Sequence, residues 1–237
     1  MYPTVARRLY FALQAIRGEP LPTALADVRR TERLSFDELL HLQAVRQLEQ
    51  LRFAAAHVPY YRRALAPLRG MLASARTWAD VAAIVQHLPV IEKGTVTAAS
   101  SEFTADNATS LPVYLDRTSG SSGTPLVFPC DQRAWAYRHA VTHRCMEWFG
   151  VAIGEPYALF FGLHWNKRKR AEVALRDRIL NRVRVSAYEI SPARVDAHLA
   201  AVETFRPTHF VGYPSAISDF CSLIRDRGFD LRGLRLK

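Results

Sequence analysis

Two hydrophobic patterns divide the chain. Up to about residue 112 the apolar residues recur at helical spacing, and from Val113 onward short apolar runs alternate with helical stretches. The second pattern is typical of βα units, in which parallel strands form a sheet that helices cover. The sequence therefore predicts an α/β fold with a mainly parallel sheet over residues 113–237. A helical segment over residues 1–112 is expected to pack on that core rather than form a separate domain.

Local signals place the helices of the first part. Ser35 and Glu38 form a capping box, which predicts a helix from Phe36 to about His57. Thr77 and Asp80 open a second, shorter helix. Residues 100–112 are small and polar, and they predict an irregular segment.

The first residues of the chain predict one more helix. Four apolar side chains fall on a single face of it, which indicates a docking or packing helix: Val5, Leu9, Leu13 and Ile16. Gln14 and Arg17 interrupt the apolar run, so we do not expect a signal peptide. No apolar run approaches the roughly 20 residues that span a bilayer.

The second part of the chain predicts alternating strands and helices. The expected strands are Val113–Leu115, Leu126–Phe128, Tyr157–Phe161, Val183–Tyr188 and Thr208–Gly212. The expected helices run from Gln132 to Phe149 with Asp131 as N-cap, from Ser191-Pro192 to Phe205, and from Pro214 to a cap at Gly228. Residues 231–237 resemble the approach to a further strand.

The net charge and the cysteine content argue against some classes of function. The net charge is +10, and eight basic residues face two acidic ones between Lys167 and Arg184. Such a run could attract polyphosphates or nucleic acid, but an arginine-rich solvated helix face is favoured, because no aromatic residues interleave with it. We therefore expect no nucleic-acid partner. Three widely spaced cysteines fit neither a disulfide framework nor a zinc site, and they suggest a reducing, cytoplasmic location.

The most informative chemistry lies in one short segment between two predicted strands. It combines hydroxyl residues and glycines ahead of a proline: Thr118, Ser119, Gly120, Ser121, Ser122, Gly123, Thr124 and Pro125. Glycine allows close approach of the backbone to a ligand, and consecutive N–H groups with Ser and Thr hydroxyls can converge on a phosphate. The segment is not a Walker A loop, since the lysine and the spacing are absent. A flexible connection has the same composition, but a linker would not be held between two strands.

This segment resembles the phosphate loop of the adenylate-forming (acyl-CoA ligase) superfamily, most of all its phenylacetate–CoA ligase and CapK-like branch. Three further landmarks occur in the order of that branch. The first two are His57-Val58-Pro59-Tyr60-Tyr61-Arg62 and Leu88-Pro89-Val90-Ile91-Glu92-Lys93, and the third is Phe205-Arg206-Pro207 followed by Val211-Gly212-Tyr213-Pro214-Ser215. The resemblance covers roughly residues 35 to 230. It implies part of the large N-terminal domain of an adenylate-forming enzyme, truncated before the remaining strands and the C-terminal domain.

The resemblance also implies a reaction, in which a small-molecule carboxylate is joined to AMP from ATP and then passed to coenzyme A. Mg²⁺ is expected with ATP, and residues 118–125 would wrap the phosphates. Gly212, Tyr213, Pro214 and Ser215 would lie against the acyl substrate, and we weigh a plain strand-to-helix turn equally. His164 follows a predicted strand and is a weaker substrate candidate, and Phe160 and Trp165 would suit an aromatic or acyl group.

Other residues carry weaker signals. His139 and His143 have i, i+4 spacing on a helix, but no third ligand is evident, so we expect no metal site. Arg144 is expected to form a structural ion pair, with phosphate contact as the alternative. No cysteine has the surroundings of a nucleophile, and no catalytic residue can be named.

The later motifs of the resembled superfamily match no position in this chain. We therefore expect the chain alone to be inactive in adenylation. The alternative is a non-catalytic, truncated relative that acts as a binding protein, with a second chain completing the fold.

Overall fold

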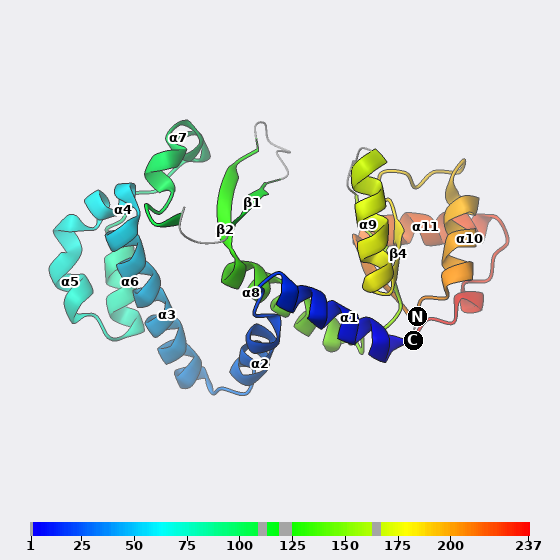
Figure 1. Ribbon diagram of the computed structural model, residues 1–237, viewed down its shortest axis with the longest axis horizontal. Coiled ribbons are helices and arrows are strands. Elements are labelled where there is room, and N and C mark those ends of the chain that lie inside the picture. Colours follow the sequence, from blue (N-terminus) through cyan, green and yellow to red (C-terminus); the bar gives the residue numbers. More distant parts are fainter. Residues whose placement is uncertain (1, 109–112, 119–124, 163–166) are drawn as a thin grey trace. The chain divides into compact units, whose positions relative to one another are not determined.

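The computed structural model describes residues 2–108, 113–118, 125–162 and 167–237, without the side chains of residues 167–172 (Figure 1). Internal contacts divide the chain into two compact units. The continuous unit is Glu19–Ala140, and the discontinuous unit joins Met1–Gly18 to Val141–Lys237. The boundary expected from the sequence, between residues 112 and 113, stays a prediction.

The continuous unit is mostly helical. Its elements are α2 (Leu21–Thr31), α3 (Phe36–His57), α4 (Pro59–Ala64), η1 (Ala66–Leu68), α5 (Arg69–Ser74), α6 (Trp78–Gln86), α7 (Lys93–Ala98), η2 (Ser100–Phe103), β1 (Val113–Arg117), β2 (Val127–Asp131) and the first part of α8 (Gln132–Glu147). Both predicted capping boxes are present. Ser35 and Glu38 open α3, and Thr77 and Asp80 open α6.

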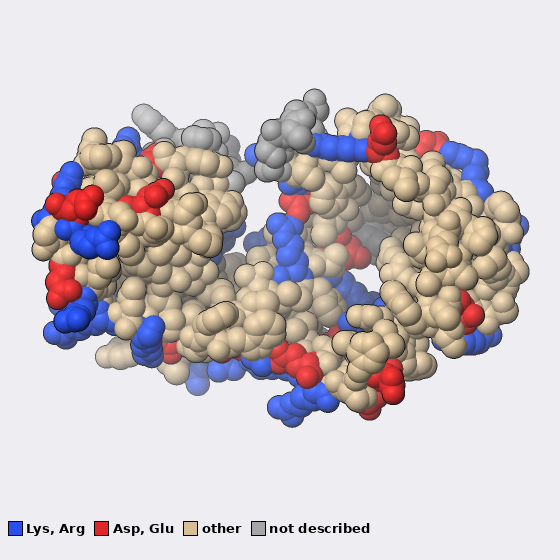
Figure 2. All heavy atoms as spheres, turned by 180° about the vertical axis from the view of Figure 1, so that it is seen from behind, with Lys and Arg blue, Asp and Glu red and all other residues tan. Residues whose placement is uncertain are grey.

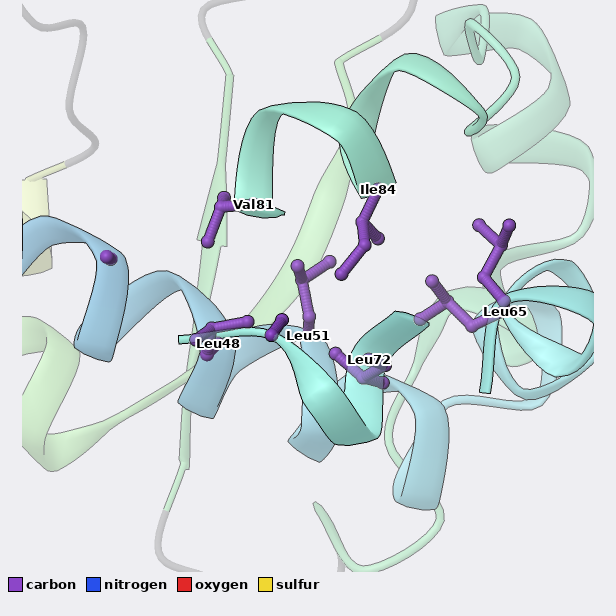
Figure 3. Packing of buried hydrophobic residues seen from close by; sticks show 9 residues of the cluster. Leu48, Leu51, Leu65, Leu72, Val81 and Ile84 are labelled. Atoms are coloured by element: carbon purple, nitrogen blue, oxygen red, sulfur yellow. The ribbon is translucent and has the colours of Figure 1, made fainter. Parts of the chain in front are cut away.

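The core of the continuous unit lies between α3, α5 and α6. Figure 3 shows apolar side chains from these helices pointing toward one another, together with Leu65 from the end of α4. Ile84 and Leu65 are completely buried, and Val81 is 1% exposed. Full burial of such a side chain stabilises a fold by about 1.5–3 kcal/mol. This unit therefore has a hydrophobic core of its own.

Part of the segment predicted to be irregular is ordered. Ser100–Phe103 forms the short helix η2, because Phe103 stacks on Tyr60 with ring centroids 4.5 Å apart and an interplanar angle of 29°. The prediction for residues 100–112 was wrong at these positions.

The discontinuous unit contains the parallel sheet. Its elements are α1 (Pro3–Ile16), the end of α8, β3 (Tyr157–Phe160), α9 (Lys167–Ile179), β4 (Arg182–Val185), α10 (Val195–Phe205), β5 (His209–Gly212), α11 (Pro214–Asp226) and η4 (Leu231–Leu234). The strand order is β4-β3-β5, and both pairs are parallel. Buried side chains from β3, β4, α10, α11 and η4 form one core, and the partly buried Phe210 of β5 packs against it. The predicted α/β class with a parallel sheet is confirmed.

The end of α11 follows the sequence prediction. Gly228 has a φ of +79°. Its N–H donates to the carbonyl of Arg225, and the N–H of Phe229 donates to the carbonyl of Ile224. This pair of bonds is the Schellman motif, and glycine suits its left-handed residue. The predicted cap is therefore confirmed.

Several predicted boundaries were wrong. Strands β1 and β2 extend to Arg117 and Asp131, beyond the predicted Leu115 and Phe128, and α8 ends at Glu147 rather than Phe149. The helix expected from Ser191 begins at Val195, because the carbonyl of Ser191 accepts the N–H groups of Arg194 and Val195 in a preceding turn. Strand β4 ends at Val185 rather than Tyr188, where another turn starts. Residues 231–234 form η4 rather than the approach to a strand.

Charged side chains are distributed over both units. In the view of Figure 2, basic and acidic side chains are scattered over the surface among uncharged residues. Within the basic run of residues 167–184, Asp177 pairs with both Arg182 and Arg184. These two arginines lie on β4 with side chains only 12% and 15% exposed, so this end of the run is not the solvated helix face that the sequence predicted. Among the described residues, none of the helices could cross a lipid bilayer.

Candidate functional site

The carboxyl ends of β3, β4 and β5 share one edge of the parallel sheet. α/β proteins bind ligands at this edge, because loops there extend beyond the strand ends. Phe161 and Gly162 follow β3, and Tyr213 follows β5. We call Phe161, Gly162, Tyr188, Gly212 and Tyr213 the aromatic edge cluster.

Two rings of the aromatic edge cluster are stacked. Phe161 and Tyr213 have ring centroids 4.8 Å apart and an interplanar angle of 25°. The backbone N–H of Tyr213 donates a 3.0 Å hydrogen bond to the carbonyl of Phe160, which ties this residue to the end of β3. Tyr213 remains 42% exposed. A ligand at this edge would therefore meet an ordered aromatic surface.

Glycines allow the close packing of the cluster. A Cβ atom on Gly212 would lie 2.0 Å from the carbonyl oxygen of Phe160, and φ at Gly212 is +148°. A Cβ atom on Gly162 would lie 2.5 Å from the ring of Tyr188. Larger residues at either position would push the strand end or the ring away.

The predicted substrate residues fall partly within this cluster. Gly212 and Tyr213 are members of it. Pro214 and Ser215 begin α11, with proline in the first turn and no acidic residue there. Ser215 is exposed at the positive end of the helix dipole. His164 and Trp165 lie outside the described residues.

One residue that was predicted to contact the acyl group does not reach the surface. Phe160 is completely buried and contacts Phe210 and Phe220, with ring centroids 4.9 and 5.3 Å away. The expectation that Phe160 suits a bound acyl group was wrong, because β3 turns this side chain into the core. Its neighbour Phe161 is half-buried and stacks on Tyr213 instead. The strand is apolar throughout, so its sequence carries no signal that separates Phe161 from Phe160.

The second predicted site is carried by a hairpin. β1 and β2 pair antiparallel, with Arg117 opposite Val127. Thr118 and Pro125 belong to the described residues, whereas Ser119, Gly120, Ser121, Ser122, Gly123 and Thr124 lie outside them.

Thr118 closes the base of this hairpin loop. Its backbone N–H donates a 3.0 Å hydrogen bond to the carbonyl of Leu126, and its Oγ1 accepts a 3.0 Å bond from the N–H of Leu126. Both ends of the loop are therefore fixed to each other.

Helix α8 supports the hairpin. Asp131 caps the helix, since its Oδ1 accepts a 2.6 Å hydrogen bond from the N–H of Ala134, as predicted. Arg138 on α8 forms an ion pair with Asp116 on β1. Burial would raise the pKa of Asp116, but the N–H of Arg117 and the guanidinium of Arg138 outweigh it, so the pKa is lowered. Asp116 is thus held as the anion that this contact requires.

Two of the three cysteines have surroundings that disfavour the thiolate. Burial raises the pKa of Cys130, and the neighbouring carboxylates of Asp131 and Asp116 add to the effect. Burial also raises the pKa of Cys221. A thiol with a raised pKa contains little thiolate at neutral pH.

The two histidines on α8 are engaged separately. His143 is buried, and its Nε2 lies 3.0 Å from the hydroxyl of Tyr10. Burial lowers the pKa of His143 to about 4. The ring of His139 lies edge-on to Trp135, 5.4 Å away. In the parts of the chain that the structure describes, no group of three potential ligands could hold a metal ion.

Arg144 contacts groups of its own helix. Its guanidinium is 3.1 Å from the carboxylate of Glu147 and lies 5.9 Å from the ring centre of Trp148. These are the contacts of a structural ion pair.

Comparison with known proteins found similarity at the level of structure. No family model matches the sequence, and no curated protein matches it. Crystal structures of 2-hydroxyisobutyryl-CoA ligase, however, are similar in fold. The structure with 2-HIB-AMP and CoA in the thioesterification state has a TM-score of 0.62 and 20% sequence identity, and the match covers 88% of this chain and 44% of that one.

Two further crystal structures of that ligase are similar in fold to this chain. The postadenylation state with 2-HIB-AMP gives a TM-score of 0.61 at 16% identity, and an open conformation with 2-HIB-AMP and CoA gives 0.62 at 18% identity. The matches cover 44% and 48% of these ligase chains. The chain therefore has the fold of part of an acyl-CoA ligase and spans about half its length.

Proposed function

We propose that this chain belongs to an AMP-forming ligase of the phenylacetate–CoA ligase and CapK-like branch. Such a protein activates a small-molecule carboxylate with ATP to an acyl-adenylate and transfers the acyl group to coenzyme A. The observation that carries this proposal is the hairpin closed by Thr118, which holds a Ser/Gly/Thr loop in a chain with an acyl-CoA ligase fold. Such a reaction fits a cytoplasmic location, where ATP and coenzyme A are available.

The loop supplies the chemistry that adenylation needs. Pyrophosphate leaves as negative charge develops on its oxygens, and fixed N–H and hydroxyl donors stabilise that charge in the transition state. In the proposal, Thr118, Pro125 and the six residues between them bind the ATP phosphates. Mg²⁺ accompanies the nucleotide and neutralises part of its charge.

The aromatic edge cluster is the proposed acyl site. The exposed face of Tyr213 is an apolar surface for the acyl group, and Phe161 behind it fixes the ring. The first turn of α11, with Ser215, offers its positive dipole end to an anionic group. His164 remains a candidate for the same site.

The proposal includes a functional limit. Motifs for the metal, the ribose and the mobile C-terminal lysine match no position here, so we expect no ATP–pyrophosphate exchange by the 237-residue chain alone. A non-catalytic binding protein, completed by a second chain, is the alternative. It would keep the fold without nucleotide affinity at the loop.

Mg-ATP binding measured by calorimetry tests the proposal. We expect wild-type binding to be abolished in Gly123→Asp, because a carboxylate in the loop repels phosphate. Gly94→Asp is the matched control, since Gly94 is exposed on α7 with nothing within 4 Å of a Cβ atom. Equal binding by all three proteins would contradict a phosphate site in the loop. Absence of binding to wild type would favour the non-catalytic alternative.

A further inference from the structure

Helix α1 presents an apolar face to solvent. Each residue turns an α-helix by 100°, so positions 2, 5, 9 and 16 lie on the same side. The side chains there are strongly exposed: Tyr2 81%, Val5 46%, Leu9 46% and Ile16 84%. We call these four residues the α1 stripe. It contains most of the apolar face that the sequence predicted for docking or packing.

A neighbouring face of α1, about a third of a turn away, is buried, although it is more polar. Ala6, Tyr10 and Gln14 are buried there. Gln14 Nε2 donates a 3.3 Å hydrogen bond to the hydroxyl of Tyr10, and this hydroxyl lies 3.0 Å from Nε2 of His143. A polar contact therefore fixes which side of the helix faces inward.

Close backbone packing holds α1 in this orientation. A Cβ atom on Gly154 would lie 2.3 Å from the carbonyl oxygen of Pro3 and 3.0 Å from the backbone nitrogen of Arg7. Only glycine permits such an approach. The helix cannot rotate the α1 stripe into the core without losing this contact and the Tyr10 network.

The charged residues of α1 and its end are all positive. Arg8 lies beside the stripe on the helix, Arg17 follows the helix, and residues 2–17 contain no Asp or Glu. The whole chain, these arginines included, has a net charge of +10. A second copy of the chain would bring the same arginines to the stripe and be repelled. A negatively charged, partly apolar surface is complementary to it.

We propose that the α1 stripe binds the surface of an anionic lipid bilayer. The helix would lie in the plane of the interface, with Val5, Leu9 and Ile16 among the acyl chains and Arg8 and Arg17 at the headgroups. The ring of Tyr2 suits the same boundary, because it has an apolar body and a polar tip. This mode needs no membrane-spanning helix. It is also independent of the proposed ligase function.

Sedimentation with lipid vesicles tests this proposal. Vesicles containing about one third phosphatidylserine are compared with neutral phosphatidylcholine vesicles, using the full chain. We expect binding to the anionic vesicles that weakens as salt increases. Leu9→Ser with Ile16→Ser should weaken it about tenfold or more, because apolar side chains supply much of the interfacial affinity. Arg8→Gln should weaken binding only to the anionic vesicles.

The control is Leu175→Ser on α9, which removes an apolar side chain that is 63% exposed but lies outside the stripe. It should bind like wild type, and circular dichroism checks that all variants are folded. Equal loss in Leu175→Ser and the stripe variant would overturn the proposal. So would the absence of wild-type binding to anionic vesicles, or a wild-type dimer that the stripe substitutions dissociate.

Discussion

The hydroxyl of Tyr137 donates a 2.7 Å hydrogen bond to the carboxylate of Asp27 and thereby links α8 to α2. Arg30 and Arg46 pair with the same carboxylate. The hydrogen bond from Tyr137 is the largest cause that lowers the pKa of Asp27 to about 2. The hairpin is followed directly by α8, so this contact belongs to the support of the proposed nucleotide loop.

Tyr137→Phe should make the protein less stable at neutral pH by about 1–2 kcal/mol. The low pKa of Asp27 in the folded state contributes stability that is present above pH 3.8 and lost as the pH falls toward 2. The difference between the variant and wild type should therefore shrink below pH 3.8. Urea unfolding at a series of pH values measures it. Tyr2→Phe, at an exposed tyrosine, should change nothing, and a pH-independent difference would contradict the assignment.

His143 should make the protein sensitive to mild acid. Its pKa is lowered from 6.5 to about 4 in the folded state, so the unfolded chain binds this proton first. Stability should fall by about 3 kcal/mol as the pH drops from 6.5 toward 4. The His143→Gln variant should lose less of its free energy of unfolding over this pH range. The His41→Gln variant, changed at a surface histidine, should lose as much as wild type. An NMR titration in which His143 gains its proton near its ordinary pKa would show that this reading is wrong.

Gly212→Ala should damage the end of β5. The new methyl would lie 2.0 Å from the carbonyl oxygen of Phe160, at a φ that side chains rarely adopt. We expect a loss of about 3 kcal/mol or more in the free energy of unfolding. Gly228→Ala, which is strained in φ but meets no atom within 4 Å, should cost only about 1 kcal/mol. If Gly212→Ala and Gly228→Ala lowered the free energy of unfolding equally, β5 would have to move away from β3 to make room for the new methyl group.

Thr118→Val should weaken Mg-ATP binding about fivefold if residues 118–125 bind phosphate. The substitution removes the hydroxyl that accepts the Leu126 N–H, and a lost hydrogen bond of this kind is worth about 1 kcal/mol. Thr118→Ser keeps the hydroxyl and should restore wild-type affinity. Calorimetry measures the Mg-ATP affinity of both variants. If Thr118→Val and Thr118→Ser had the same affinity, the hydrogen bond that closes the hairpin would not contribute to nucleotide binding.

Local signals predicted much of the fold. Ser35 with Glu38, Asp131 and Gly228 each satisfy backbone groups within a few residues, so the helix ends that they cap were correct. The prediction that a helix begins at Ser191 was wrong, because the carbonyl of Ser191 takes part in a turn. Sequence patterns do not distinguish such a turn from a helix cap. The order β4-β3-β5 depends on pairing between distant segments, which a local pattern does not encode.

The candidate site was predictable only in outline. Gly212 and Tyr213 were identified from a motif, and both lie at the carboxyl edge of the sheet. Phe161 was missed in favour of Phe160, because a fully apolar strand gives no alternation from which to tell its two faces apart. The contact of Tyr188 with Gly162 joins two βα units, so no single segment of sequence indicates it.

The division of the chain has a consequence for its synthesis. Residues 19–140 form one compact unit and leave the ribosome before the parallel sheet exists, so they can fold while translation continues. Helix α1 is made first, yet its partners Gly154 and His143 come more than a hundred residues later. During that interval the nascent chain exposes both faces of α1, and a chaperone or a membrane surface could engage it before the rest of its unit is complete.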